Sequence, residues 1–141
     1  MKRNTVFYLL LLFWIAFTSC KPNEETPYIL FKNTAEDIIL SDTWNVPLNT
    51  TELLYIECGF VEKGHILYER QVDDEPERHD LIFEKSEDIK ILSKKRRNNL
   101  RIETAVISTT FDNTLMSQGS EVKITVRDRS EMGRTFTYVV R

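Results

Sequence analysis

Thiol and imidazole groups, which serve as nucleophiles and metal ligands, are scarce in this chain: it holds Cys20, Cys58, His65 and His79 and no others. A catalytic thiol needs exposure and a base or a positive charge beside it. Period-2 alternation places Cys58 on the apolar face of a predicted strand, and the spacing brings neither histidine next to it. We therefore expect Cys58 to be a buried structural residue.

An acidic segment, Asp73–Asp80, holds enough carboxylate oxygen for a calcium ion, which takes six to eight such ligands. It lacks the spaced Asp or Asn positions and the central glycine of a known calcium loop, and Arg78 adds a positive charge. His65 and His79 do not have the spacing of a zinc site. The chain also lacks a glycine-rich phosphate loop and a G-x-S-x-G motif. The sequence therefore predicts no metal, no cofactor and no catalytic site.

Basic side chains are concentrated in one stretch of the chain. They are Lys94, Lys95, Arg96, Arg97 and Arg101. The pattern predicts a charged turn, Ser93–Asn99, with Arg101 on the strand that follows. Like charges at a hairpin tip are easily hydrated, and cations keep sheet edges from pairing with other chains. The alternative is a contact for an acidic partner, such as a phosphorylated glycolipid or an anionic polysaccharide.

Aromatic rings offer a second kind of contact. Trp44, Tyr28, Tyr55 and Tyr68 have flat faces on which sugar rings can stack, or they pack in the core and along sheet edges. The pattern alone leaves both interpretations open.

The first twenty residues have the composition of a secretory signal. Lys2 and Arg3 precede an apolar run, Val6–Phe17, and small residues follow it. The run holds twelve residues, whereas a membrane-spanning helix needs roughly 20. The stretch therefore predicts export rather than a permanent span.

The end of this signal, Phe17-Thr18-Ser19-Cys20, resembles the lipobox of bacterial lipoproteins, in which small residues lead into an obligatory cysteine. The resemblance implies that Cys20 receives a thioether-linked diacylglycerol, becomes the new N-terminus and gains a third acyl chain. Several chains on one residue hold a protein stably in a membrane. Lys21 stands where an aspartate often retains enteric lipoproteins in the inner membrane, which favours the outer membrane, on its periplasmic or cell-surface face.

Cleavage before Cys20 leaves about 122 residues, the size of one domain. We expect a signal over residues 1–19, a lipidated N-terminus and polar tether over 20–27, and a single domain over 28–141. Loss of Lys2 and Arg3 lowers the basic residues from 19 to 17 against 22 acids, a net charge of −5. This acidic balance argues against nucleic-acid partners. Cys58 alone remains as a thiol, so the sequence predicts no intrachain disulfide.

Alternating apolar and polar residues broken by turn residues predict an all-β fold. The expected strands are Tyr28–Lys32, Asp37–Ser41, Glu52–Phe60, His65–Val72, Leu81–Lys85, Ile89–Leu92, Leu100–Thr110, Glu121–Asp128 and Arg134–Arg141. A broken helix is the alternative for the fifth and sixth of these, with Leu81, Ile82, Ile89 and Leu92 as its apolar residues. A loop is expected over Ser41–Thr50. The pattern favours an antiparallel β-sandwich of immunoglobulin-like architecture, with a small closed barrel as the alternative.

Taken together, these features predict an outer-membrane lipoprotein, held through lipid on Cys20, whose β-sandwich binds or scaffolds a glycan or a protein and catalyses nothing. The alternative is a small-ligand-binding or enzyme-inhibiting β-barrel lipoprotein.

Overall fold

The structure is a computed structural model and describes residues 26–61, 65–73, 79–80, 87–129 and 132–141. Within these ranges the chain forms strands and no helix. The strands in chain order are β1 Tyr28–Lys32, β2 Thr43–Val46, β3 Thr50–Phe60, β4 Leu67–Val72, β5 His79–Asp80, β6 Ile89–Arg97, β7 Leu100–Phe111, β8 Glu121–Arg127 and β9 Gly133–Val140.

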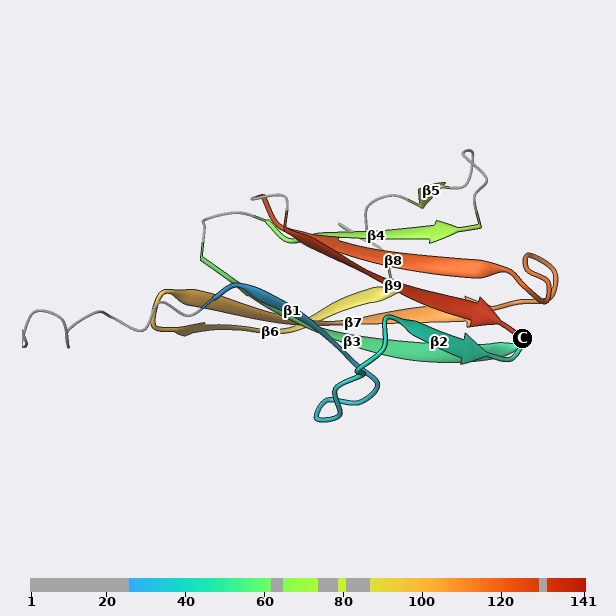
Figure 1. The fold of residues 1–141 in the computed structure, drawn as a ribbon, viewed down its shortest axis with the longest axis horizontal. Coiled ribbons are helices and arrows are strands. Elements are labelled where there is room, and N and C mark those ends of the chain that lie inside the picture. The colour runs from blue at the N-terminus through green and yellow to red at the C-terminus, as the bar shows by residue number, and fades with distance from the viewer. Residues whose placement is uncertain (1–25, 62–64, 74–78, 81–86, 130–131) are drawn as a thin grey trace, which may run out of the picture.

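These strands form two sheets that face one another (Figure 1). One sheet has the order β1-β3-β7-β6 and the other β2-β9-β8-β4-β5. All neighbours are antiparallel except β2 and β9, which are parallel. Strands β1, β3, β7 and β6 take the positions of strands A, B, E and D of an immunoglobulin constant-type sandwich, and β4, β8 and β9 those of C, F and G. The predicted immunoglobulin-like sandwich is confirmed, and the closed-barrel alternative is wrong because each sheet is open.

The core lies between the two sheets. Alternation in β3 turns Leu54, Ile56, Cys58 and Phe60 inward, as predicted, and in β8 and β9 it buries Val122, Ile124, Val126, Phe136, Tyr138 and Val140. Phe31 of the first sheet meets Phe136 of the second with ring centroids 5.2 Å apart. Each fully buried side chain of this size contributes roughly 1.5–3 kcal/mol relative to exposure. The sandwich therefore has an apolar core that does not depend on a disulfide.

Two expected elements near the N-terminus are wrong. Asp37–Ser41 is not a strand, because only Ile39 is buried there and Ile38 makes a single bridge to Lys32. Conversely, the expected loop Ser41–Thr50 contains β2, which pairs along the outer edge of β9. The predicted strand Leu81–Lys85 lies outside the described residues.

Candidate functional site

The basic residues lie in a β-hairpin made by β6 and β7, not in the charged turn that the sequence predicted. β6 continues through Arg97, and only Asn98 and Asn99 connect it to β7. Asn98 takes the left-handed backbone conformation, with φ at 52°, which asparagine adopts more readily than most residues. The turn is therefore short, and the cations alternate between the two faces of an edge strand.

Strand register assigns each cation to a face. Lys94 stands opposite Glu103, and Arg96 opposite Arg101. Glu103 is 8% exposed and continues the buried face of β7 that holds Ala105. This pattern places Lys94, Arg96 and Arg101 on the core side of the sheet. Lys95 and Arg97 fall on the outward side, because side chains alternate along a strand.

Glu103 is a carboxylate at the margin of the core with two partners. The Tyr68 hydroxyl donates a hydrogen bond of 2.8 Å to Oε1 of Glu103. The Lys94 ammonium lies 3.6 Å from Oε2. Burial is the main cause that raises the pKa of Tyr68 above its ordinary value, and the negative charge of Glu103 adds to it, so the hydroxyl stays protonated and donates. The alternation of polar and apolar residues does not predict this contact, because Tyr68 and Glu103 are 35 residues apart in the sequence.

Arg96 and Arg101 form a pair of like charges. They are direct cross-strand neighbours in the register of β6 and β7. Among the described residues, neither guanidinium makes an ion pair with a carboxylate. Cross-strand pairs of equal charge destabilise a sheet. The hairpin therefore carries a local excess of positive charge on the core side.

The chain enters the sandwich at the same end as this hairpin. Tyr28 begins β1 and pairs with Gly59, Gly59 pairs with Ile102, and Ile102 pairs with Lys95. These four residues form one row across the sheet. In Figure 1 the tip of the β6–β7 hairpin reaches past the β8–β9 end of the opposite sheet. A tether preceding β1 would thus start beside the basic tip.

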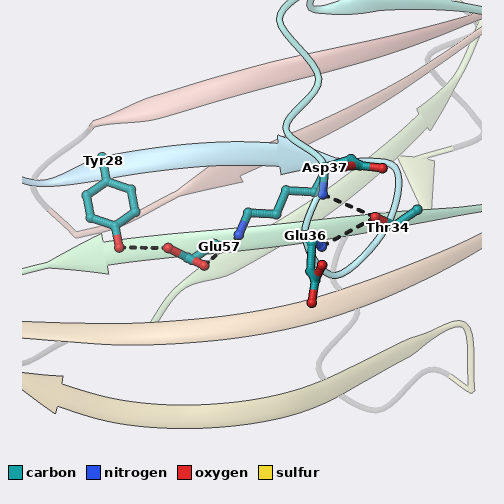
Figure 2. A network of polar contacts seen from close by, with 6 residues as sticks. Tyr28, Thr34, Glu36, Asp37 and Glu57 are labelled. Carbon is teal, nitrogen blue, oxygen red and sulfur yellow. Dashed lines mark hydrogen bonds and ion pairs between the residues drawn. The ribbon is translucent and has the colours of Figure 1, made fainter.

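A polar network joins β1 to β3 on the outward face of the first sheet. The Tyr28 hydroxyl donates to Oε1 of Glu57 at 2.9 Å, and Lys32 Nζ donates to Oε2 at 2.8 Å (Figure 2). The hydrogen bond from Lys32 is the main cause that holds the pKa of Glu57 below its ordinary range. Thr34 Oγ1 then accepts the backbone N–H groups of Glu36 and Asp37 at 3.3 and 3.1 Å. These contacts fix β1 and the turn that follows it.

Cys58 is a buried free cysteine, as expected. Its exposure is 0%. Burial, with a smaller contribution from the charge of Glu103, raises the pKa of the thiol to about 12. Nucleophilic cysteines have lowered pKa values, so the environment of Cys58 disfavours the thiolate.

The acidic segment is described only at its ends. Asp73 takes a positive φ of 50°, and its carboxylate accepts the backbone N–H of Glu121 at 2.8 Å. Residues 74–78 and the side chain of His79 lie outside the described part. Among the described residues, no three His, Cys, Asp or Glu side chains gather as a metal site would require.

The four aromatic residues have different surroundings. Tyr68 is buried and faces Glu103, so it offers no stacking surface. Trp44 is 40% exposed on the edge strand β2. Tyr28 and Tyr55 share the outward face of the first sheet and are half-buried.

Cys20 and the apolar run before it lie outside the described residues, so the lipidation site stays a prediction. The described residues include no helical segment that could span a lipid bilayer. No family model matches the chain, and no curated protein matches it.

Proposed function

We propose that the protein is a lipid-anchored outer-membrane lipoprotein whose immunoglobulin-like sandwich is a non-catalytic binding module for a glycan or a protein. The anchor is inferred from the signal and from Cys20, which ends a lipobox-like sequence. Because the thiol of Cys58 is buried and its pKa is raised, the residue with the strongest nucleophilic chemistry in the domain is not placed for catalysis. The two sheets are open, which rules out the closed barrel on which the alternative of a small-ligand-binding or enzyme-inhibiting lipoprotein depends.

The proposal is supported above all by one observation: the chain enters the sandwich at the same end of the sheet as the basic β6–β7 hairpin. Tyr28 and Lys95 lie in the same cross-strand row. Residues 20–27 span at most about 25–30 Å when extended. An anchor on Cys20 would therefore keep the hairpin near the lipid headgroups. A binding surface at this end would act close to the membrane.

Metabolic labelling tests the anchor. Cells expressing the wild-type chain and the Cys20→Ser variant are grown with radioactive fatty acid, and their membranes are fractionated. The proposal expects label in the wild-type protein, its recovery with the outer membrane, and no label in the variant. Cys58→Ser is the matched control, because it removes the other cysteine and should leave the labelling unchanged. Equal label in wild type and Cys20→Ser would refute the anchor.

A further inference from the structure

The side chains on the core side of β7 change from apolar to charged as the strand approaches the hairpin tip. Ile107 and Ala105 are fully buried, Glu103 is nearly buried, and Arg101 is half-buried. Arg96 on β6 stands directly opposite Arg101 and is exposed. Tyr68, the second residue of β4, contacts Glu103 from the opposite sheet, and the tip of the β6–β7 hairpin extends past the end of that sheet (Figure 1). Arg96 and Arg101 thus lie at the open margin of the core.

The positive charges of Arg96 and Arg101 repel each other, and no described carboxylate neutralises them. Directly opposed residues have Cβ atoms about 4.5–5.5 Å apart, so the two guanidinium groups can reach one small ligand. The carboxylate two residues along the same face, Glu103, already accepts from Tyr68 and pairs with Lys94. Among the described side chains, no carboxylate forms an ion pair with either arginine. A bound anion would remove the repulsion.

The chemistry of that anion follows from the arginines. A guanidinium presents planar N–H donors that match the oxygens of a phosphate in pairs. Two guanidiniums suit a phosphate monoester, which has three free oxygens and nearly two negative charges near neutral pH. We propose that Arg96 and Arg101 together bind the phosphomonoester group of a membrane lipid headgroup. We name this pair the arginine clamp.

The assignment of this phosphate to a lipid headgroup rests on the proposed lipid anchor, which keeps the hairpin tip within reach of headgroups. The clamp itself is a property of the β6–β7 hairpin and is measurable in solution. Lys95 and Arg97 on the outward face add to the local positive potential and do not share the ligand, because alternate residues of a strand point to opposite sides.

The test uses the full chain in micelles of an uncharged detergent, which hold the protein whether or not Cys20 is acylated. Inorganic phosphate and dihexanoyl phosphatidic acid are titrated by calorimetry at low salt. The clamp variant is Arg96→Gln with Arg101→Gln. The control is Lys90→Gln with Lys95→Gln, which removes the same number of charges from the outward face of β6 in positions opposite Val106 and Ile102. Unfolding midpoints of both variants confirm that they fold.

The proposal expects the clamp variant to bind both ligands at least about tenfold more weakly, and the control to change affinity less than about threefold. Arg96→Lys with Arg101→Lys should lose most of the affinity although the charge is kept. Equal losses in clamp and control variants, or no phosphate binding by the wild type, would overturn the clamp. Phosphate binding without binding of the phosphatidic acid would overturn the lipid source. Fatty-acid labelling of Cys20 reports separately on the anchor.

Discussion

The ring of Tyr28 lies directly over Gly59. A Cβ atom built on Gly59 would come 2.6 Å from Cε1 and 2.9 Å from Cδ1 of that ring. Glycine is therefore required at position 59 because it has no side chain, which lets the Tyr28 ring pack against the backbone of β3. The backbone conformation itself does not require glycine there. The hydroxyl of the same ring reaches Glu57, which ties the first strand to the sheet near the basic tip.

We expect Gly59→Ala to lower the free energy of unfolding by about 1–3 kcal/mol, because the added methyl group displaces the Tyr28 ring. Chemical denaturation of the full chain measures the change. In a Tyr28→Ala background, the same substitution should cost much less, since the ring is gone. An equal cost in both backgrounds would show that Tyr28 does not create the requirement for glycine.

The two partners of Glu103, Tyr68 and Lys94, should contribute unequally to the free energy of unfolding. Tyr68→Phe removes a buried donor to a carboxylate and should cost about 1.5–3 kcal/mol of unfolding free energy. Lys94→Gln removes an ammonium whose side chain is 73% exposed, and such pairs contribute under about 1 kcal/mol. Thermal or denaturant unfolding at neutral pH compares the two variants. A larger loss in Lys94→Gln would contradict the assigned burial of the Tyr68–Glu103 contact.

The ionisation of Glu57 should make the free energy of unfolding depend on pH in the acidic range. Its pKa in the folded protein lies below the ordinary value of 4.5, mainly because Lys32 donates to it. The stabilisation is therefore complete above that value and is lost as the pH falls through the folded pKa. The difference in unfolding free energy between wild type and Glu57→Gln should shrink from about pH 6 to about pH 3. Lys32→Met should show the same trend, and a difference independent of pH would contradict the account.

Cys58 should resist thiol reagents in the folded protein. It has no exposed surface, and its pKa is raised to about 12, so the reactive thiolate is almost absent at neutral pH. In the domain expressed from Lys21, where Cys58 is the one cysteine, reaction with a chromogenic disulfide should become fast only when denaturant unfolds the chain. A reductant should leave the melting temperature unchanged, because Cys58 is free. Rapid labelling without denaturant would show that the thiol is accessible.

Substitution of the same residue should cost stability. Cys58→Ser places a more polar hydroxyl in this buried site and should lower the unfolding free energy by on the order of 1–3 kcal/mol. Cys58→Ala is the control without a polar group. If Ser were better tolerated than Ala, a hydrogen-bonding partner such as Tyr68 would have to satisfy the hydroxyl.

The sequence predicted those strands in which one face is apolar and the other polar. In Glu121–Arg127, Val122, Ile124 and Val126 alternate with polar residues, and the structure buries all three. β2 escaped prediction because only Val46 of its four residues is buried. Asp37–Ser41 was predicted wrongly because its apolar residues are mostly exposed, with Leu40 at 94%. Local polarity is a weak guide at sheet edges, where few side chains reach the core.

The sequence predicted which basic residues form the candidate site, but not how they are arranged. Four consecutive cations, Lys94 to Arg97, have no alternation of polarity, so they were expected in a turn and lie instead in β6. The pairing of Arg96 with Arg101 depends on the register set by the two-residue turn. The Tyr68–Glu103 contact joins two different sheets. Tertiary arrangement decides such contacts, and periodicity carries no signal of them.

The mass of the mature protein tests the central claim most directly. The full chain is expressed in a bacterium that processes lipoproteins, extracted from its outer membrane, and weighed intact by mass spectrometry. The account predicts a chain that begins at Cys20 and carries a diacylglycerol group on that residue. A mature chain that begins elsewhere, or one that keeps an unmodified thiol at Cys20, would contradict it.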